Sequence, residues 1–109
     1  MAAATLPPVN RTAPVALAKV LGPVPAGEEW SVDVRICNNG TIDDTFDLRI
    51  RKTDGSNAAW RAKAHPVPVG SGTFDIELKL LLTEGFELWD ASAGGRVDAS
   101  YTGAKRSVA

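Results

Sequence analysis

The alternation of apolar and polar residues between Trp30 and Cys37 is the feature that most constrains how this chain folds. The apolar positions are Trp30, Val32, Val34 and Ile36, and the polar positions are Ser31, Asp33, Arg35 and Cys37. Because successive side chains of a strand point to opposite faces, this spacing predicts a β-strand with one buried face and one solvated face. Val, Ile and Trp are also residue types that pack well on a half-buried sheet.

Turn residues bound this strand and recur along the chain. Pro25-Ala26-Gly27 precedes it, and Asn38-Asn39-Gly40 follows it with residues that tolerate a tight reversal. Further strand patterns cover 14–20, 43–52, 58–64, 73–82, 86–91 and 96–101, and the two prolines in 66–69 favour a loop there. The sequence therefore predicts a single all-β domain: an antiparallel β-sandwich of about seven strands, jelly-roll or immunoglobulin-like.

Length and charge limit the classes of partner. The 109 residues suffice for one modest core, and 44% of them are hydrophobic. Twelve basic residues nearly balance thirteen acidic ones, so we expect neither a nucleic-acid partner nor an anionic membrane surface. Cys37 is the single cysteine, which favours synthesis in a reducing cytoplasm. We see no signal peptide and no apolar run long enough for a membrane span.

The first thirteen residues differ from the rest in lacking a strand pattern. Pro7-Pro8 favours an extended, polyproline-like path, so we expect an N-terminal arm over 1–13 and the β-sandwich over 14–109. One interpretation is a loose terminus. The other is an arm that lies on a neighbouring subunit, with Leu6, Pro7, Pro8 and Val9 in the interface.

The sequence shows no constellation typical of an enzyme. His65 is the only histidine, and its sequence neighbours supply no Ser or Asp partner for a triad or a metal site. Cys37 is predicted on an outer face, with no base in evidence. Asp43, Asp44 and Asp47 lack the downstream Glu of a calcium loop and indicate a solvated strand start. We expect no catalytic residue, no metal and no cofactor.

The three tryptophans are more informative. Trp30 lies on the predicted core face. Trp60 shares a face with small residues, and Trp89 shares one with Glu87 and Ala91. Exposed tryptophans stack on sugar rings or anchor protein interfaces. The alternative is that both faces of these strands are buried, one in the core and one under a neighbouring segment.

The order of turns and strands resembles that of small all-β virion proteins of tailed bacteriophages. The resemblance covers about residues 24–103 and rests on two parts. The first is Val24-Pro25-Ala26-Gly27, with the following strand running into Cys37-Asn38-Asn39-Gly40. The second is Leu81-Leu82-Thr83-Glu84-Gly85, then a strand and the Ala93-Gly94-Gly95 turn.

The resemblance implies a structural role in the virion after synthesis in the bacterial host cytoplasm. The implied function is that of a capsid decoration (cement) protein, or of a tail, neck or baseplate module. It would act through contacts with other phage structural proteins and with copies of itself. The alternative is a carbohydrate-binding module for host recognition, built on Trp60 and Trp89.

Overall fold

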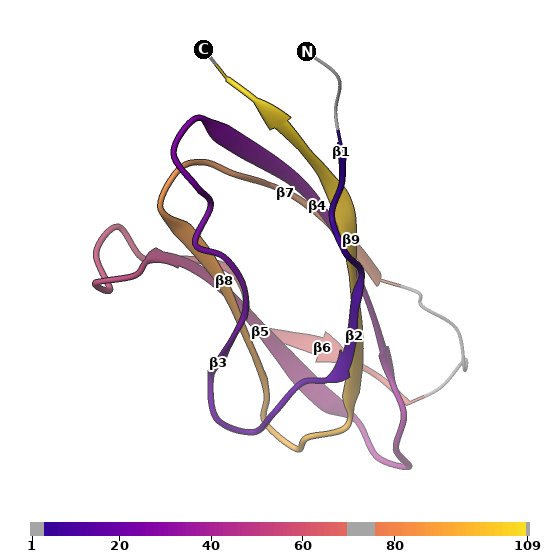
Figure 1. The fold of residues 1–109 in the computed structure, drawn as a ribbon. Coiled ribbons are helices and arrows are strands. Elements are labelled where there is room, and N and C mark those ends of the chain that lie inside the picture. The colour runs from indigo at the N-terminus through magenta and orange to yellow at the C-terminus, as the bar shows by residue number, and fades with distance from the viewer. Residues whose placement is uncertain (1–3, 70–75, 109) are drawn as a thin grey trace.

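The computed structural model describes residues 4–69 and 76–108 and places them in two antiparallel β-sheets (Figure 1). No helix occurs among these residues, which confirms the all-β prediction. The strands are β1 (Ala4–Thr5), β2 (Val9–Thr12), β3 (Ala18–Leu21), β4 (Glu28–Asn38), β5 (Asp44–Lys52), β6 (Ala59–Val67), β7 (Ile76–Leu82), β8 (Phe86–Ser92) and β9 (Val97–Ser107).

The two sheets differ in the order of their strands. The first sheet has the order β1-β9-β4-β7, with β2 also pairing with β9. The second has the order β3-β8-β5-β6. The apolar faces of both sheets form one core, whose largest fully buried side chains include Tyr101, Phe46, Ile36, Leu48, Leu82 and Leu88. The sheets therefore act as two layers around a shared interior.

Strand β4 behaves as its alternation predicts. Val32, Val34 and Ile36 are buried in the core, while Trp30 is half-buried and packs against its edge. β4 lies between β9 and β7, so both of its backbone edges are hydrogen-bonded. A central position explains why this strand shows the clearest apolar face.

Each predicted strand segment has a counterpart, with shifted bounds. The 14–20 segment contributes only its end, as part of β3, and β9 continues past the predicted end at Tyr101 to Ser107. Residues 73–75 lie outside the described residues. The loop predicted for 66–69 is wrong at Pro66 and Val67, which belong to β6 and pair with Thr45 and Asp44. β6 pairs only with β5 among the described residues, and a proline without an N–H is tolerated on such an edge strand.

The separate N-terminal arm is not confirmed. β1 and β2 pair with β9, and Leu6 and Ala13 are buried in the same core as the other strands. Pro7-Pro8 lies between β1 and β2, where the missing N–H groups interrupt the ladder without preventing pairing on either side. Residues 4–13 are therefore part of the two-sheet fold.

Candidate functional site

A row of alternating cationic and aromatic side chains crosses the outer face of the second sheet. Lys19 on β3 is the register partner of Trp89 on β8, which in turn pairs with Arg49 on β5. Arg49 also pairs with Trp60 on β6. Because directly opposed residues of neighbouring strands project from the same face, these four side chains form one line across the sheet, here called the cross-sheet row.

Cations lie directly over the indole rings of this row. The Arg49 guanidinium carbon is 4.9 Å from the centroid of the Trp60 ring, and the Lys63 ammonium nitrogen is 4.1 Å from the same centroid. The Arg51 guanidinium carbon is 3.8 Å from the centroid of the Trp89 ring. All three distances fall within the range in which the ring quadrupole attracts a cation. Trp60 remains 40% exposed, so the row is open to solvent at β6.

Glu87 holds the Trp89 end of the row in place. Its Oε1 atom accepts a hydrogen bond of 3.1 Å from Trp89 Nε1, and its Oε2 atom accepts one of 3.1 Å from the Thr53 hydroxyl. Lys19 Nζ lies 3.7 Å from the same Oε2 atom. Glu87 is buried, so these partners stabilise a carboxylate that water reaches poorly.

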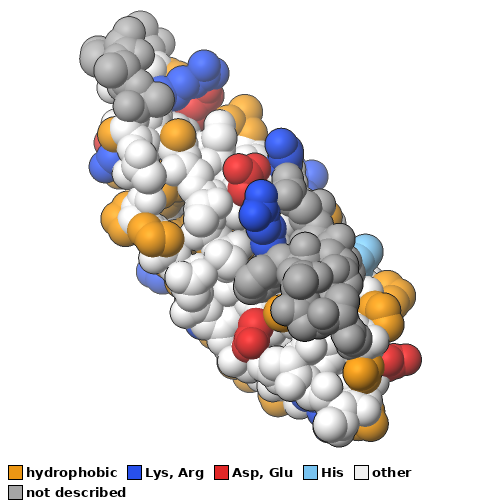
Figure 2. Space-filling model, turned by 90° about the vertical axis from the view of Figure 1, so that its right-hand side faces the viewer, with side chains coloured by type: hydrophobic (Ala, Val, Ile, Leu, Met, Phe, Trp, Pro, Cys, Tyr) orange, Lys and Arg blue, Asp and Glu red, His pale blue; other side chains and the backbone are white. Residues whose placement is uncertain are grey.

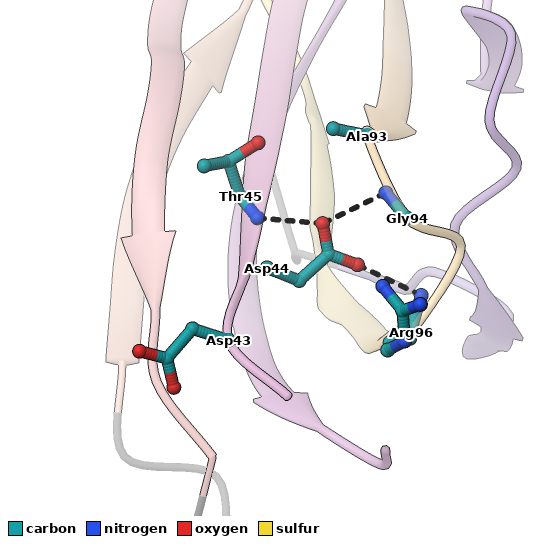
Figure 3. Close-up of a pocket in the computed structure, with 6 residues that line it drawn as sticks. All are labelled: Asp43, Asp44, Thr45, Ala93, Gly94 and Arg96. Carbon is teal, nitrogen blue, oxygen red and sulfur yellow. Dashed lines mark hydrogen bonds between the residues drawn. The ribbon is translucent and has the colours of Figure 1, made fainter. Parts of the chain in front are cut away.

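A second candidate site lies at the end of the molecule opposite the described chain ends, here called the loop end (Figure 1). An open depression of about 400 Å³ is lined by Asp43, Asp44, Thr45, Ala93, Gly94 and Arg96 (Figure 3). The Asp43 side chain points away from Asp44, and its Oδ1 atom accepts a hydrogen bond from the Val69 N–H. The two carboxylates therefore do not act as a pair.

Asp44 organises the depression as a hydrogen-bond acceptor. Its Oδ1 atom accepts from the N–H groups of Thr45 (2.7 Å) and Gly94 (2.8 Å). Its Oδ2 atom accepts from the Ser92 hydroxyl (2.7 Å) and the Arg96 N–H (2.9 Å). Burial opposes ionisation, but these hydrogen bonds together outweigh it and lower the pKa of Asp44 from 3.8 to about 2. The expectation of a solvated acidic cluster is thus wrong for Asp44, which fixes the β8–β9 turn.

Exposed apolar side chains lie close to this depression: Ile42 precedes Asp43, the Val69 N–H is bonded to Asp43, and Val15 lies beside Gly95. Val15, Ile42 and Val69 are 67%, 55% and 43% exposed, and they come from three separate connections at the loop end. Val69 is tied to Asp43 by its N–H, and the Ile42 carbonyl accepts a hydrogen bond of 2.8 Å from Asn38 Nδ2. The loop end therefore presents an apolar rim on hydrogen-bonded loops.

A buried polar cluster joins the two sheets but offers no surface. Asp90 on β8 is fully buried and accepts hydrogen bonds from the Tyr101 hydroxyl on β9 and from the Arg11 guanidinium on β2. Arg11 also donates to the carbonyls of Lys19 (3.3 Å) and Ala18 (3.4 Å). Burial, together with the charge of Asp90, raises the pKa of Tyr101 far above its usual value of 10. We assign this cluster a structural role.

The residues singled out for an interface lie in two places. Leu6 is buried, Pro7 and Pro8 are exposed, and Val9 is half-buried, all along β9 of the first sheet. Trp60 and half-buried Trp89 lie in the cross-sheet row with Arg49 between them. An interface role for these residues stays a prediction. His65 and Cys37, considered as catalytic groups, are both half-buried.

Sequence reasoning missed the cations of the cross-sheet row. The alternation places Arg49 and Arg51 on an outer face, but it does not give the register that sets them beside Trp60 and Trp89. It also missed the exposed apolar rim, because Val15 was included in the strand predicted for 14–20, and Ile42 and Val69 belong to connections that show no strand pattern.

Comparisons of this chain with protein-family models, curated proteins and solved structures find no match. Across residues 4–69 and 76–108, no group of three or more His, Cys, Asp or Glu side chains is placed to hold a metal ion. The same part of the chain holds no helix of the length and apolarity that crossing a membrane requires. The candidate sites therefore rest on their own geometry.

Proposed function

We propose that the chain is a structural component of a bacteriophage particle, a capsid decoration (cement) protein or a tail, neck or baseplate module. It acts through protein–protein contacts with other particle proteins and with copies of itself. The observation that supports a docking role is the loop end, where three exposed apolar side chains lie beside an open depression. The assignment to a phage particle rests on the resemblance of the turns and strands described above.

The chemistry of the loop end suits a protein partner. A protein interface combines an apolar contact area with hydrogen-bonding groups and loses little ordering entropy when its loops are already fixed. Asp44 fixes the β8–β9 turn through three hydrogen bonds, and Asp43 fixes the start of the β6–β7 connection. A partner that covers Val15, Ile42 and Val69 would remove apolar surface from water, which stabilises the complex by about 25 cal/mol for each Å² buried.

The test measures binding of the purified chain to phage particles and to their isolated capsid and tail proteins. The variant Val15→Ser/Ile42→Ser removes most of the rim and should weaken binding at least tenfold. The matched control Leu81→Ser changes an apolar residue that is 54% exposed on β7 of the first sheet, away from the loop end, and should bind as the native chain does. Circular dichroism verifies that both variants stay folded.

Self-association is tested by the mass in solution. A homo-oligomer should show a multiple of the 11.5 kDa chain mass. A monomer that binds no particle protein would contradict the proposed structural role. Binding that the rim variant leaves unchanged would contradict the assignment of the loop end.

Trp60 favours a second candidate function, that of a carbohydrate-binding module for host recognition. Its ring is 40% exposed on a flat sheet face, where a sugar ring can approach it. A glycan array, followed by a titration of tryptophan fluorescence with any glycan that binds, tests this function. Binding that Trp60→Ala leaves unaltered would refute the role of this ring.

A further inference from the structure

We propose that the outer face of the second sheet binds an acidic polysaccharide, whose carboxylates pair with Arg49, Arg51 and Lys63. The inference rests on the carbohydrate-binding function above and narrows its ligand to anionic sugars. It is independent of the loop end, which lies at the edge of the two sheets rather than on this face.

Several cations on this face carry uncompensated charge. Among the described residues, Arg49, Arg51 and Lys63 make no ion pair. Arg61, which follows Trp60, makes none with a described residue either. The carboxylates on the strands of this face are engaged within the protein. Asp47 accepts a hydrogen bond of 2.7 Å from the Ala64 N–H.

Glu87, the other carboxylate, is engaged by Trp89, Thr53 and Lys19. Arg49 and Lys63 therefore have no carboxylate within ion-pair distance among the described residues, and Arg51 has none either, although Glu87 is its register partner. The side of the molecule that carries the first sheet is different. There, backbone and uncharged polar side chains cover much of the view, and acidic and basic groups lie next to one another (Figure 2).

The indole rings orient two of these cations. A guanidinium that lies over an indole ring is held by the ring and keeps N–H groups along its edge to bind an anion. Arg49 is held in this way by Trp60, and Arg51 by Trp89. A carboxylate accepts two parallel hydrogen bonds from such an edge, which makes this a strong type of contact. The rings therefore hold the cations ready for a carboxylate.

The positions of the cations over the rings favour an acidic sugar over other ligands. A nucleobase or neutral sugar binds mainly by stacking, and on these rings it competes with the cations that lie over them. An acidic sugar supplies a carboxylate in each unit, which can pair with a cation while that cation stays over its ring.

The dimensions of the row agree with an oligosaccharide. The row spans four strands, from Lys19 to Trp60. Strands are spaced by about 4.8 Å, so the row is about 14 Å long. A short stretch of a sugar polymer that lies across the strands meets cation and indole in turn.

The experiment titrates the full chain with a panel of uronic-acid polymers (alginate, polygalacturonate and hyaluronan), with neutral dextran and with single-stranded oligothymidylate. Calorimetry and tryptophan fluorescence report binding at low and at high salt. We expect at least one acidic polymer to bind, to change the fluorescence, and to be released by salt. The variant Arg49→Gln/Lys63→Gln should weaken that binding at least tenfold.

The control Lys105→Gln/Arg106→Gln removes the same charge from β9 of the first sheet and should keep binding within about twofold of the native chain. Equal weakening by both variants would mean attraction by net charge alone and overturn the proposed site. Binding of dextran without any acidic polymer would overturn the anionic specificity while leaving the carbohydrate-binding function in place. Tighter binding of oligothymidylate overturns the inference, and absence of binding to every polysaccharide overturns both.

Discussion

Replacing Asp90 with alanine should lower the free energy of unfolding by about 3 kcal/mol, the lower part of the range for breaking a buried ion pair. Asp90 is fully buried, and its carboxylate is the acceptor for the Tyr101 hydroxyl and the Arg11 guanidinium. In the variant, the buried Tyr101 hydroxyl loses its acceptor, and Arg11 keeps a positive charge without a carboxylate. The Arg11 side chain is 28% exposed, so water compensates part of that charge and the lower part of the range applies.

The assay is urea denaturation followed by tryptophan fluorescence, with a thermal scan beside it. At about 4 °C per kcal/mol for a domain of this size, the midpoint should fall by about 12 °C. The control Asp98→Ala removes a carboxylate on the outer face of the first sheet, which accepts hydrogen bonds from Thr12 (2.7 Å) and Asn39 (2.6 Å). It should cost less than about 1 kcal/mol because water replaces these bonds.

A double-mutant cycle with Arg11→Met isolates the pair from other effects of the alanine. The coupling between Arg11 and Asp90 should exceed about 1 kcal/mol, since both side chains belong to one buried network. A loss on Asp90→Ala no larger than that of Asp98→Ala would refute the reasoning, as would an additive cycle. Either result would mean that the cluster is hydrated rather than buried between the sheets.

Further predictions concern Asp44, Tyr101 and the glycines. Asp44→Asn should cost about 2 kcal/mol, because both carboxylate oxygens accept from donors and the new NH₂ group must face one of them. The pKa of Asp44 is about 2 in the folded chain against 3.8 in the unfolded chain, which stabilises the protein above pH 4. That contribution should be lost as the pH falls towards 2. Urea titrations of the native chain and the variant at several pH values check this. The raised pKa of Tyr101, the single tyrosine, should make stability fall as the pH rises above 10, with phenolate absorbance appearing only on unfolding. Gly103→Ala should lower the free energy of unfolding by more than about 2 kcal/mol, since a Cβ there would lie 2.0 Å from the Ser31 carbonyl oxygen. Gly55→Ala places its Cβ with nothing within 4 Å and should cost about 1 kcal/mol. Urea denaturation compares the two variants.

The strands that are visible in the sequence are those whose pattern is local. β4 and β5 alternate over most of their length, and their apolar residues, such as Val34 and Leu48, are buried as predicted. Alternation reports only which residues share a face, which the pleat of a single strand fixes. It was therefore sufficient for the class of fold and for much of the core.

The pairing partners of the strands could not be predicted from the sequence, because strand pairing depends on tertiary structure. β1 and β2 are short, and Pro7-Pro8 interrupts the strand pattern between them. The local sequence therefore does not indicate that they pair with β9. The edge position of β6, which permits Pro66 inside a strand, likewise depends on the neighbours of that strand.

The candidate site was accessible only in part for the same reason. Trp60 and Trp89 stand out by residue type. Their relation to Arg49 depends on the register of three strands, which shifts around Leu48 between β5 and β6. A shift of one residue moves a side chain to the other face, so the row could not be derived from spacing alone.

The pairing of β2 with β9 also governs when this protein can fold during its synthesis. Thr12 and its hydrogen-bond partner Asp98 are 86 residues apart, and β4 depends on β9 as well. When the ribosome has released β1 to β8, the first sheet still lacks the strand that joins its N-terminal edge to its centre. The entropy of closing so long a loop makes such contacts slow to form. We therefore expect the nascent chain to expose Leu6 and the apolar face of β4 until β9 has emerged, and folding to be completed only then.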